Sequence, residues 1–495
     1  MNYPTLGTKY AGARRPLSLV LAAVLALSLP ATLAACSDNV PEGGTPGVTE
    51  AITLPDLTDD RTPTDVAAYE GRFAAAFATT SPAPETDFTY TVSDGGVTVT
   101  GYTGSEMTVV IPDTMGGNPV TTIAEGAFAG KGTMQALSIP DSVTVIGIGA
   151  LEGCRSLTTL RTPVFTCETA PYFGALFGAT DHEINGSAVP ATLSTLILTA
   201  GVTVPDYAFY DCRGLEAVSL PATVESIGAF AFYGNKSLAY MPLDHTALVT
   251  VGERAMTNCA SLLSLSLPAT VDRMGFAFLE GCGRLETLTL PFVGRYRPGS
   301  TLSADEQRAV NHGEAPAPAE AAYLGYLFGA ADYAFSAGYL PASLITLTLH
   351  EGCGDVPPNA FFECATLRSV VLPAGVTSIG RRAFYGCESL AGITLPATVT
   401  TLGEDAFRDC IRLTALEGGE GLTTLGVQAF MGCLSLSSVT LPATVTHLPN
   451  AAFSGCLSLT TLTAPGVTTQ GAQVFRHCDK LQGWNTSTET SAKGT

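Results

Sequence analysis

The sequence is poor in charge, and in positive charge most of all. Only 14% of its 495 residues are Asp, Glu, Lys or Arg, and 44 acids outnumber 24 bases, which gives a formal net charge of −20. Such a chain repels nucleic acid and anionic lipid surfaces. We therefore expect no nucleic acid partner, while the 46% of hydrophobic residues supply ample material for a buried core.

Motifs that carry catalysis or bind metals are also missing. His182-Glu183 is followed by Ile-Asn-Gly and so makes no His-Glu-x-x-His pattern, and neither a Gly-x-Ser-x-Gly elbow nor a phosphate-binding loop occurs. No Cys-x-x-Cys pair exists, and the six histidines are scattered. The sequence predicts no catalytic residue, no metal site and no cofactor, hence a protein that is not an enzyme. A catalytic group assembled across distant units is the open alternative.

Long apolar runs are limited to one stretch near the N-terminus. Arg14-Arg15 precede an apolar run from Leu17 to Leu33, and Leu33-Ala34-Ala35-Cys36 closes it, as in an export signal. This end resembles the lipobox of bacterial lipoproteins, which implies that Cys36 is lipidated and becomes the mature N-terminus. The membrane is then reached through this lipid only. One alternative is an ordinary signal peptide cleaved after Ala34 or Ala35. The other is a membrane-spanning anchor, for which the apolar run is short.

What the sequence has in abundance is one repeated unit. Residues 379–402 read Ile-Gly-x-x-Ala-Phe-x-Gly-Cys-x-Ser-Leu-x-x-Ile-x-Leu-Pro-x-x-Val-Thr, and the unit starts again at Leu402-Gly403. Each cysteine follows a phenylalanine by three residues and precedes a leucine by three, and the cysteines recur every 23 residues, at Cys364, Cys387, Cys410, Cys433 and Cys456. A fixed period of this size predicts a solenoid, in which each coil buries its apolar side against the next.

The repeated unit contains two short strand patterns and no room for a long helix. Leu288-Thr289-Leu290-Pro291 alternates apolar and polar residues with period 2, as a strand with one buried face does, and the proline ends it. The following Val-Thr-x-Ile/Leu-Gly can add a second short strand.

The unit resembles the BspA-type leucine-rich repeat of bacterial surface proteins, over most of the chain after about residue 87. The resemblance implies a mainly β repeat solenoid of about 23-residue coils, with a parallel β-sheet on one face. It also implies display at the cell surface, where such stacks often bind proteins of a host or a neighbouring cell.

The chain divides into five segments by composition and repeat. Two units are longer than the others, near 160–215 and 290–367, because Tyr172–Ala179 aligns with Tyr323–Ala330 and both feed back into a standard unit. We expect these inserts to pack within the stack. The predicted segments are a lipoprotein signal peptide (1–35), an acidic, Pro/Thr-rich disordered tether (36–86), an N-terminal β cap (87–122), the solenoid (123–484, with an excursion at 295–321) and a disordered tail (485–495).

Ten of the thirteen cysteines occupy the one repeat position. In a stack they form a column at one strand spacing, about 4.8 Å, with parallel side chains, which is poor geometry for a disulfide. Asn235 fills the same position without loss of register. We expect buried thiols that act as small hydrophobic residues, and bridging of some of them is the alternative.

Two surfaces are candidates for binding. The exposed residue of each Leu-x-Leu strand is mostly a small hydroxyl, and in register these residues form a stripe that can bind an extended partner through many weak contacts. Such a stripe has few hot-spot residues, so tight binding is predicted at the excursion, which carries Arg295, Tyr296 and Arg297. The alternatives are that threonine merely suits an exposed strand and that the excursion is a plain insertion. The predicted stripe residues are Thr289, Thr394, Thr440 and Thr463.

The sequence as a whole predicts an exported, lipid-anchored protein at the bacterial cell envelope, exposed at the surface. Its predicted function is non-catalytic adhesion to an extracellular protein, on a host cell, a neighbouring cell or the matrix. The alternatives are a glycan-binding protein that captures polysaccharide, and a passive spacer.

Overall fold

The computed structural model describes residues 66–167, 170–312 and 316–482. The chain separates into two units, Met1–Asp60 and Arg61–Thr495, and the description concerns the second. The structure does not describe the predicted signal peptide, the predicted lipidation site Cys36, the first part of the predicted tether or the predicted tail.

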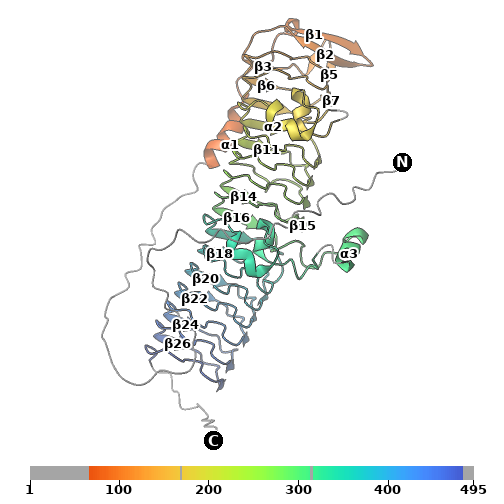
Figure 1. Ribbon diagram of the computed structural model, residues 1–495. Coiled ribbons are helices and arrows are strands. Elements are labelled where there is room, and N and C mark those ends of the chain that lie inside the picture. The colour runs from red at the N-terminus through yellow and green to blue at the C-terminus, as the bar shows by residue number, and fades with distance from the viewer. Residues whose placement is uncertain (1–65, 168–169, 313–315, 483–495) are drawn as a thin grey trace, which may run out of the picture. The chain divides into compact units, whose positions relative to one another are not determined.

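Short parallel strands stack into a first strand row, with one strand from nearly every coil (Figure 1). In the coil of Tyr240 an isolated bridge to Ala217 takes the place of the strand. These are the Leu-x-Leu segments, and neighbouring strands pair with a 23-residue offset in the standard coils, as between Ile393 and Leu416. The first strand row consists of β3 (Thr108–Val110), β6 (Ala136–Ser138), β8 (Thr159–Thr162), β9 (Thr195–Leu198), β11 (Ala217–Ser219), β14 (Ser264–Ser266), β16 (Thr287–Leu290), β17 (Thr346–Leu349), β18 (Ser369–Val371), β20 (Gly392–Leu395), β22 (Ala415–Gly418), β24 (Ser438–Thr440) and β26 (Thr461–Thr463).

A second strand row runs beside it, built from two-residue strands that follow the Leu-x-Leu strand and its turn, which in most units contains the proline. Here too the pairs are parallel, as between Ile379 and Leu402. The sequence therefore predicted both strands of the unit. The second strand row consists of β7 (Val145–Ile146), β10 (Thr203–Val204), β12 (Ser226–Ile227), β13 (Thr250–Val251), β15 (Arg273–Met274), β19 (Ser378–Ile379), β21 (Thr401–Leu402), β23 (Thr424–Leu425), β25 (His447–Leu448) and β27 (Thr469–Gln470).

The Ala-Phe turn forms the third side of each coil, where backbone bonds also join successive coils. The amide of Phe384 donates to the carbonyl of Ala406 at 2.8 Å, and the amide of Phe407 donates to that of Ala429 at 2.8 Å. The residue before Ala-Phe takes a left-handed conformation even where it is not glycine, with φ of 55° at Arg382 and 56° at Asp405. The inter-coil bonds hold this conformation, which no sequence pattern predicts.

Aromatic rings stack through the centre of the C-terminal coils. The rings of Phe384 and Phe407 lie 5.0 Å apart with 3° between their planes, and Phe407 and Phe430 follow at 5.5 Å. All three side chains are fully buried. The predicted inward positions are therefore confirmed, and they form one continuous core.

The coils also approach closely where the repeat has its glycine. A Cβ on Gly426 would lie 2.2 Å from the carbonyl carbon of Gly403, so only glycine lets the two backbones pass. This contact explains why Gly380, Gly403 and Gly426 recur in the unit.

The described cysteines are free thiols, and all of them are buried. In eight coils the thiol donates a hydrogen bond to the carbonyl of the phenylalanine slot one coil earlier, for example Cys410 to Phe384 at 3.1 Å and Cys433 to Phe407 at 3.1 Å. Cys212 and Cys364, which follow the long units, bond locally instead. The prediction of buried side chains is confirmed, but the hydrogen bond was not foreseen.

Asn235 shows by contrast what the thiol contributes. It is fully buried in the cysteine position, and neither its amide oxygen nor its amide nitrogen has a hydrogen-bond partner among the described residues. An unsatisfied buried polar group costs about 1–3 kcal/mol.

We expect Asn235→Cys to raise the free energy of unfolding by about 1–3 kcal/mol, because the thiol fits the position and can donate to the carbonyl of Phe209. Urea unfolding followed by circular dichroism measures the change. Cys410→Asn is the matched reverse substitution and should destabilise by a similar amount. If Cys410→Asn stabilised the protein, the conclusion that a thiol suits this buried position better than an amide would be contradicted.

The N-terminal end is closed by a small sheet in the order β1-β2-β5-β4. β1 and β2 form an antiparallel hairpin whose turn has positive φ at Asp94 and Gly95, as the Asp-Gly-Gly sequence predicts. The rings of Phe88, Tyr102 and Phe128 cluster beneath it. The strands are β1 (Phe88–Ser93), β2 (Gly96–Tyr102), β4 (Thr114–Met115) and β5 (Asn118–Ile123).

Helices are short and lie outside the standard coils. The two long units each place a 3₁₀ helix of five residues where other coils have the Ala-Phe turn, and the amides of Phe173 and Leu324 donate to the carbonyls of Ala208 and Ala360 in the next coil. The prediction that both inserts pack within the stack is confirmed. The helices are α1 (Val66–Ala75), α2 (Asn185–Ala188), α3 (Ala304–Asn311), η1 (Glu85–Asp87), η2 (Phe173–Phe177), η3 (His182–Ile184), η4 (Leu324–Phe328) and η5 (Tyr333–Gly338).

Candidate functional site

The outer face of the first strand row is open toward the C-terminal end. Thr440 pairs with Thr463, and Thr394 pairs with Glu417, so these residues stand in register. Each is exposed, as is Val371 at 48%. We call Val371, Thr394, Glu417, Thr440 and Thr463 the strand-face column. Thr289, the remaining predicted residue, pairs with Thr348 and is half-buried.

Toward the N-terminal end the same face is covered by α1. The rings of Tyr69 and Phe73 stack on Tyr240 at 5.9 and 6.0 Å, and the guanidinium of Arg72 pairs with Glu216 at 2.6 Å. The described part of the segment predicted to be a tether thus contains a helix that packs on the stack. This helix, α1, spans Val66–Ala75 and includes Tyr69, Arg72 and Phe73.

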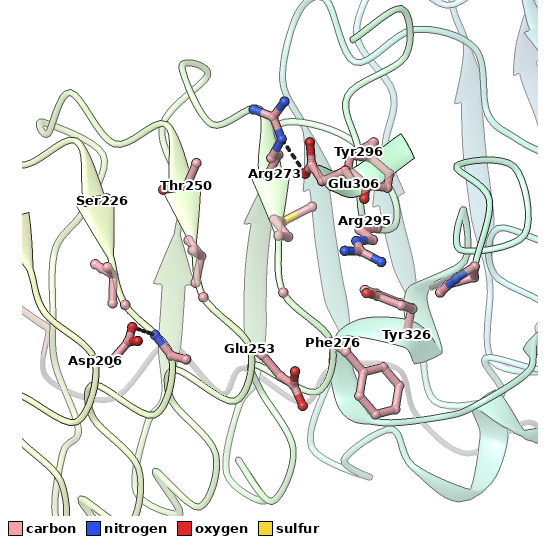
Figure 2. A pocket seen from close by; sticks show the side chains of 18 of the residues that line it. Asp206, Ser226, Thr250, Glu253, Arg273, Phe276, Arg295, Tyr296, Glu306 and Tyr326 are labelled. Atoms are coloured by element: carbon pink, nitrogen blue, oxygen red, sulfur yellow. Dashed lines mark hydrogen bonds and ion pairs between the residues drawn. The ribbon is translucent and has the colours of Figure 1, made fainter. Parts of the chain in front are cut away.

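A cavity of about 1270 Å³ lies where the second strand row meets the excursion. Four residues stand in register along β10, β12, β13 and β15 and lead toward it, namely the exposed Thr203 and the half-buried Ser226, Thr250 and Arg273. Figure 2 shows Arg295, Tyr296, Glu306 and Tyr326 gathered at the end of this line. The excursion and the second long unit supply these four residues.

The excursion is fixed to the stack by residues 295–297, which run antiparallel to β15. The amide of Met274 donates to the carbonyl of Arg295 at 2.9 Å, and the amide of Arg297 donates to that of Asp272 at 3.0 Å. Further out, Arg273 bonds Glu306 at 2.9 Å and the carbonyl of Thr301 at 3.1 Å. One edge of the β10-β12-β13-β15 sheet is closed in this way.

Of the three excursion residues predicted to bind a partner, Arg297 is used by the fold. Its guanidinium donates to the carbonyl of Val271 at 2.6 Å and to that of Ala269, and lies over the ring of Phe292 at 5.6 Å. We therefore assign Arg297 to holding the excursion in place. Its neighbours Arg295 and Tyr296 line the cavity.

Arg295 and two tyrosines bring unpaired donors to the cavity. Arg295 lies over the ring of Tyr296 at 4.8 Å, and no described carboxylate or carbonyl bonds its guanidinium. The hydroxyl of Tyr296, a residue only 6% exposed, has no hydrogen-bond partner among the described residues, and none is found there for Tyr326 either. Burial raises the pKa of both tyrosines, and the charge of Arg295 opposes that rise in each. Figure 2 shows the side chain of Arg295 between those of Tyr296 and Tyr326.

The acidic residues of the cavity are already engaged. Although burial alone would raise it, hydrogen bonds from Ser303 and Arg273 hold the pKa of Glu306 below its ordinary value. The other four carboxylates accept a backbone amide or pair with an arginine: Asp206 with Ala229, Glu253 with Arg254, Glu320 with Ala317, and Asp332 with Ala334. Among the described charged residues of the lining, Arg295 is thus the one whose side chain has neither an ionic partner nor a hydrogen bond.

Sequence reasoning missed this cavity because it followed one strand of each unit only. The register argument that located the strand-face column, applied to the second strand, would have aligned Thr203, Ser226, Thr250 and Arg273. No sequence pattern placed Tyr326 beside Arg295, because 30 residues of irregular chain separate them.

Three other kinds of site were predicted or considered: a metal site, a membrane-spanning helix and the lipidated cysteine. Within the three described ranges, no group of three or more His, Cys, Asp or Glu residues could hold a metal ion. None of the helices in those ranges is long and apolar enough to cross a bilayer. The predicted lipidation site, Cys36, lies outside them.

Stacked coils of about 23 residues with parallel strand rows define a leucine-rich repeat solenoid. The chain matches the family described as BspA type leucine rich repeat region, in six copies over residues 109–172, 202–295 and 354–482. These matches cover more than half of the sequence, and the protein belongs to this family. Proteins with this repeat are generally not enzymes and commonly bind other proteins.

Solved structures of bacterial leucine-rich repeat proteins are similar over most of their length. A leucine-rich repeat protein from Bacteroides ovatus is 20% identical, with 80% of this chain and 92% of that chain covered and a TM-score of 0.33. A leucine rich cell surface protein from Faecalibacterium prausnitzii is 21% identical, with 79% and 96% covered and a TM-score of 0.32. No curated protein matches the sequence.

Proposed function

We propose that this protein is displayed at the bacterial cell envelope, attached through a lipid on Cys36, and binds an extracellular protein without catalysis. The binding surface is the first strand row between β18 and β26. The exposed strand-face column carries the proposal, since its residues stand in register on a rigid core and point outward.

The hydroxyls of this face differ from those that hold the coils together. Elsewhere in the unit, Thr414 and Thr460 donate to carbonyls of the preceding coil at 3.0 Å, and Thr398 donates to the carbonyl of Val376 at 2.7 Å. Thr394, by contrast, reaches only Glu417, at 3.4 Å. The strand-face column can therefore bond a partner without weakening the stack.

The contact with α1 supports the idea that a protein segment can bind this row. Two aromatic side chains and one arginine of α1 make the contact, on Tyr240 and Glu216. Aromatic residues and arginine are the types that dominate protein interfaces. The open part of the row, beyond β18, offers the same strands without such a cover in the described chain.

A binding screen tests the proposal. Purified residues 37–495 are passed over immobilised extracellular-matrix proteins and over whole host and bacterial cells, with biolayer interferometry and flow cytometry as readouts. We expect saturable binding to at least one protein, lost after protease treatment of the cells. Binding to no protein would leave the passive spacer and contradict the proposal.

A further inference from the structure

The cavity beside the excursion offers donors and one positive charge that nothing in the described chain satisfies. Arg295 carries the charge, and Tyr296 and Tyr326 carry the two hydroxyls. Leaving a buried donor without an acceptor is costly, so the hydroxyl of Tyr296 fits a ligand that brings an acceptor. A guanidinium between two hydroxyls suits a planar, singly charged carboxylate, because it can donate two parallel bonds to the two oxygens.

The surrounding charges limit the ligand to one negative charge at this place. Five carboxylates also line the cavity, although each is paired or accepts a hydrogen bond. A phosphate, with up to two charges, would be repelled by them. The same repulsion, together with a net charge of −20 for the chain, opposes a peptide with several acidic residues.

The walls fit a carbohydrate better than a peptide. Peptides that bind beside a sheet usually add a strand to its edge, but residues 295–297 already pair with β15 at this edge. The remaining lining includes the hydroxyl side chains of Thr203, Ser226 and Thr250 and the ring of Phe276. It ends at Tyr296 and Tyr326. Hydroxyl groups and aromatic faces are what sugar rings contact, and about 1270 Å³ holds several rings.

We infer that this cavity binds an acidic carbohydrate, with the carboxylate of one sugar ring held by Arg295 and the hydroxyls of Tyr296 and Tyr326. Neighbouring rings lie along Thr203, Ser226 and Thr250. This site is separate from the strand-face column and adds a second class of ligand to the proposed protein binding. The excursion then serves as the wall that positions Arg295.

Calorimetric titration of residues 37–495 with a trisaccharide that carries a single glucuronic acid tests the inference, with its carboxyl-reduced neutral analogue and a short peptide containing one glutamate as parallel arms. We expect the acidic trisaccharide to bind at least tenfold more tightly than either. Arg295→Gln should weaken its binding tenfold or more, and Tyr326→Phe should weaken it severalfold while keeping the ring. Arg284→Gln, at an exposed arginine outside the cavity, is the matched control and should change nothing.

Circular dichroism and the melting temperature show whether each variant is folded. If Arg295→Gln does not fold, the binding of Tyr326→Phe alone tests the inference. The inference would be overturned if the neutral trisaccharide bound as tightly as the acidic one, or if both variants bound the acidic trisaccharide as tightly as the unaltered protein does. Preferential binding of the peptide with the same dependence on Arg295 would reassign the cavity to acidic protein segments, and no binding in any arm would also overturn it. None of these outcomes bears on protein binding at the strand-face column.

Discussion

Raising the pH above about 9 is expected to unfold the coil stack steeply, because the core contains a column of thiols. Burial raises the pKa of eight thiols of this column and of two buried thiols outside it, Cys167 and Cys353, from the ordinary value of 9.0 to about 11 at Cys154 and Cys167, to about 12 at Cys282, and further at Cys387. Above the unfolded pKa the folded state holds protons that the unfolded state releases, so stability falls as pH rises. Below that pKa the stability from this source is fully present.

The slope is large because each thiol contributes about 1.4 kcal/mol per pH unit between its unfolded and folded pKa values. Urea unfolding at a series of pH values from 7 to 11 measures it. In a variant with serine at Cys387, Cys410 and Cys433, the hydroxyls do not ionise in this range and the slope should fall by about 4 kcal/mol per pH unit. An unchanged slope would mean that the thiols are not buried in protonated form.

Removing one ring from the aromatic stack is expected to cost about 3–5 kcal/mol of unfolding free energy. Phe407→Ala deletes a fully buried ring that lies 5.0 Å from Phe384 and 5.5 Å from Phe430, and the rigid coils on either side cannot collapse into the space. In a stack stabilised by neighbour contacts, the loss falls on the coils next to it. Urea unfolding and hydrogen exchange of those coils measure it.

Phe335→Ala is the matched control, since Phe335 is 63% exposed in η5. It should change the free energy of unfolding by less than about 0.5 kcal/mol. If the two substitutions lowered the free energy of unfolding by similar amounts, the assignment of Phe407 to the buried aromatic stack would be contradicted.

The repeat made most of the fold predictable. A 23-residue period fixes which residues face inward, so the burial of Phe407 and Cys410 and the pairing of Thr440 with Thr463 followed from spacing alone. The left-handed φ at Arg382 could not be predicted, because bonds between coils, not the residue type, impose it. The thiol hydrogen bond to the preceding coil likewise depends on the stacked geometry.

The candidate sites were predictable in part, and for the same reason. The strand-face column obeys the period, whereas Arg295, Tyr296 and Arg297 lie in an irregular segment whose path no period determines. Arg297 turned out to bond the carbonyl of Val271, 26 residues earlier in the chain, while Arg295 reaches the cavity. The contact of α1 with Tyr240 joins residues about 170 positions apart and had no sequence signal.

The most direct test of the proposed function is the affinity of strand-face variants for a protein partner found in the screen. The double variant Thr394→Arg, Thr440→Arg places two bulky charged side chains on the strand-face column, and Thr424→Arg places one on the exposed second strand row of the same coils as the control. The proposal predicts that the double variant binds at least tenfold more weakly while the control binds like the unaltered protein. Unchanged affinity of the double variant, with the fold intact by circular dichroism, would show that the partner does not bind the first strand row.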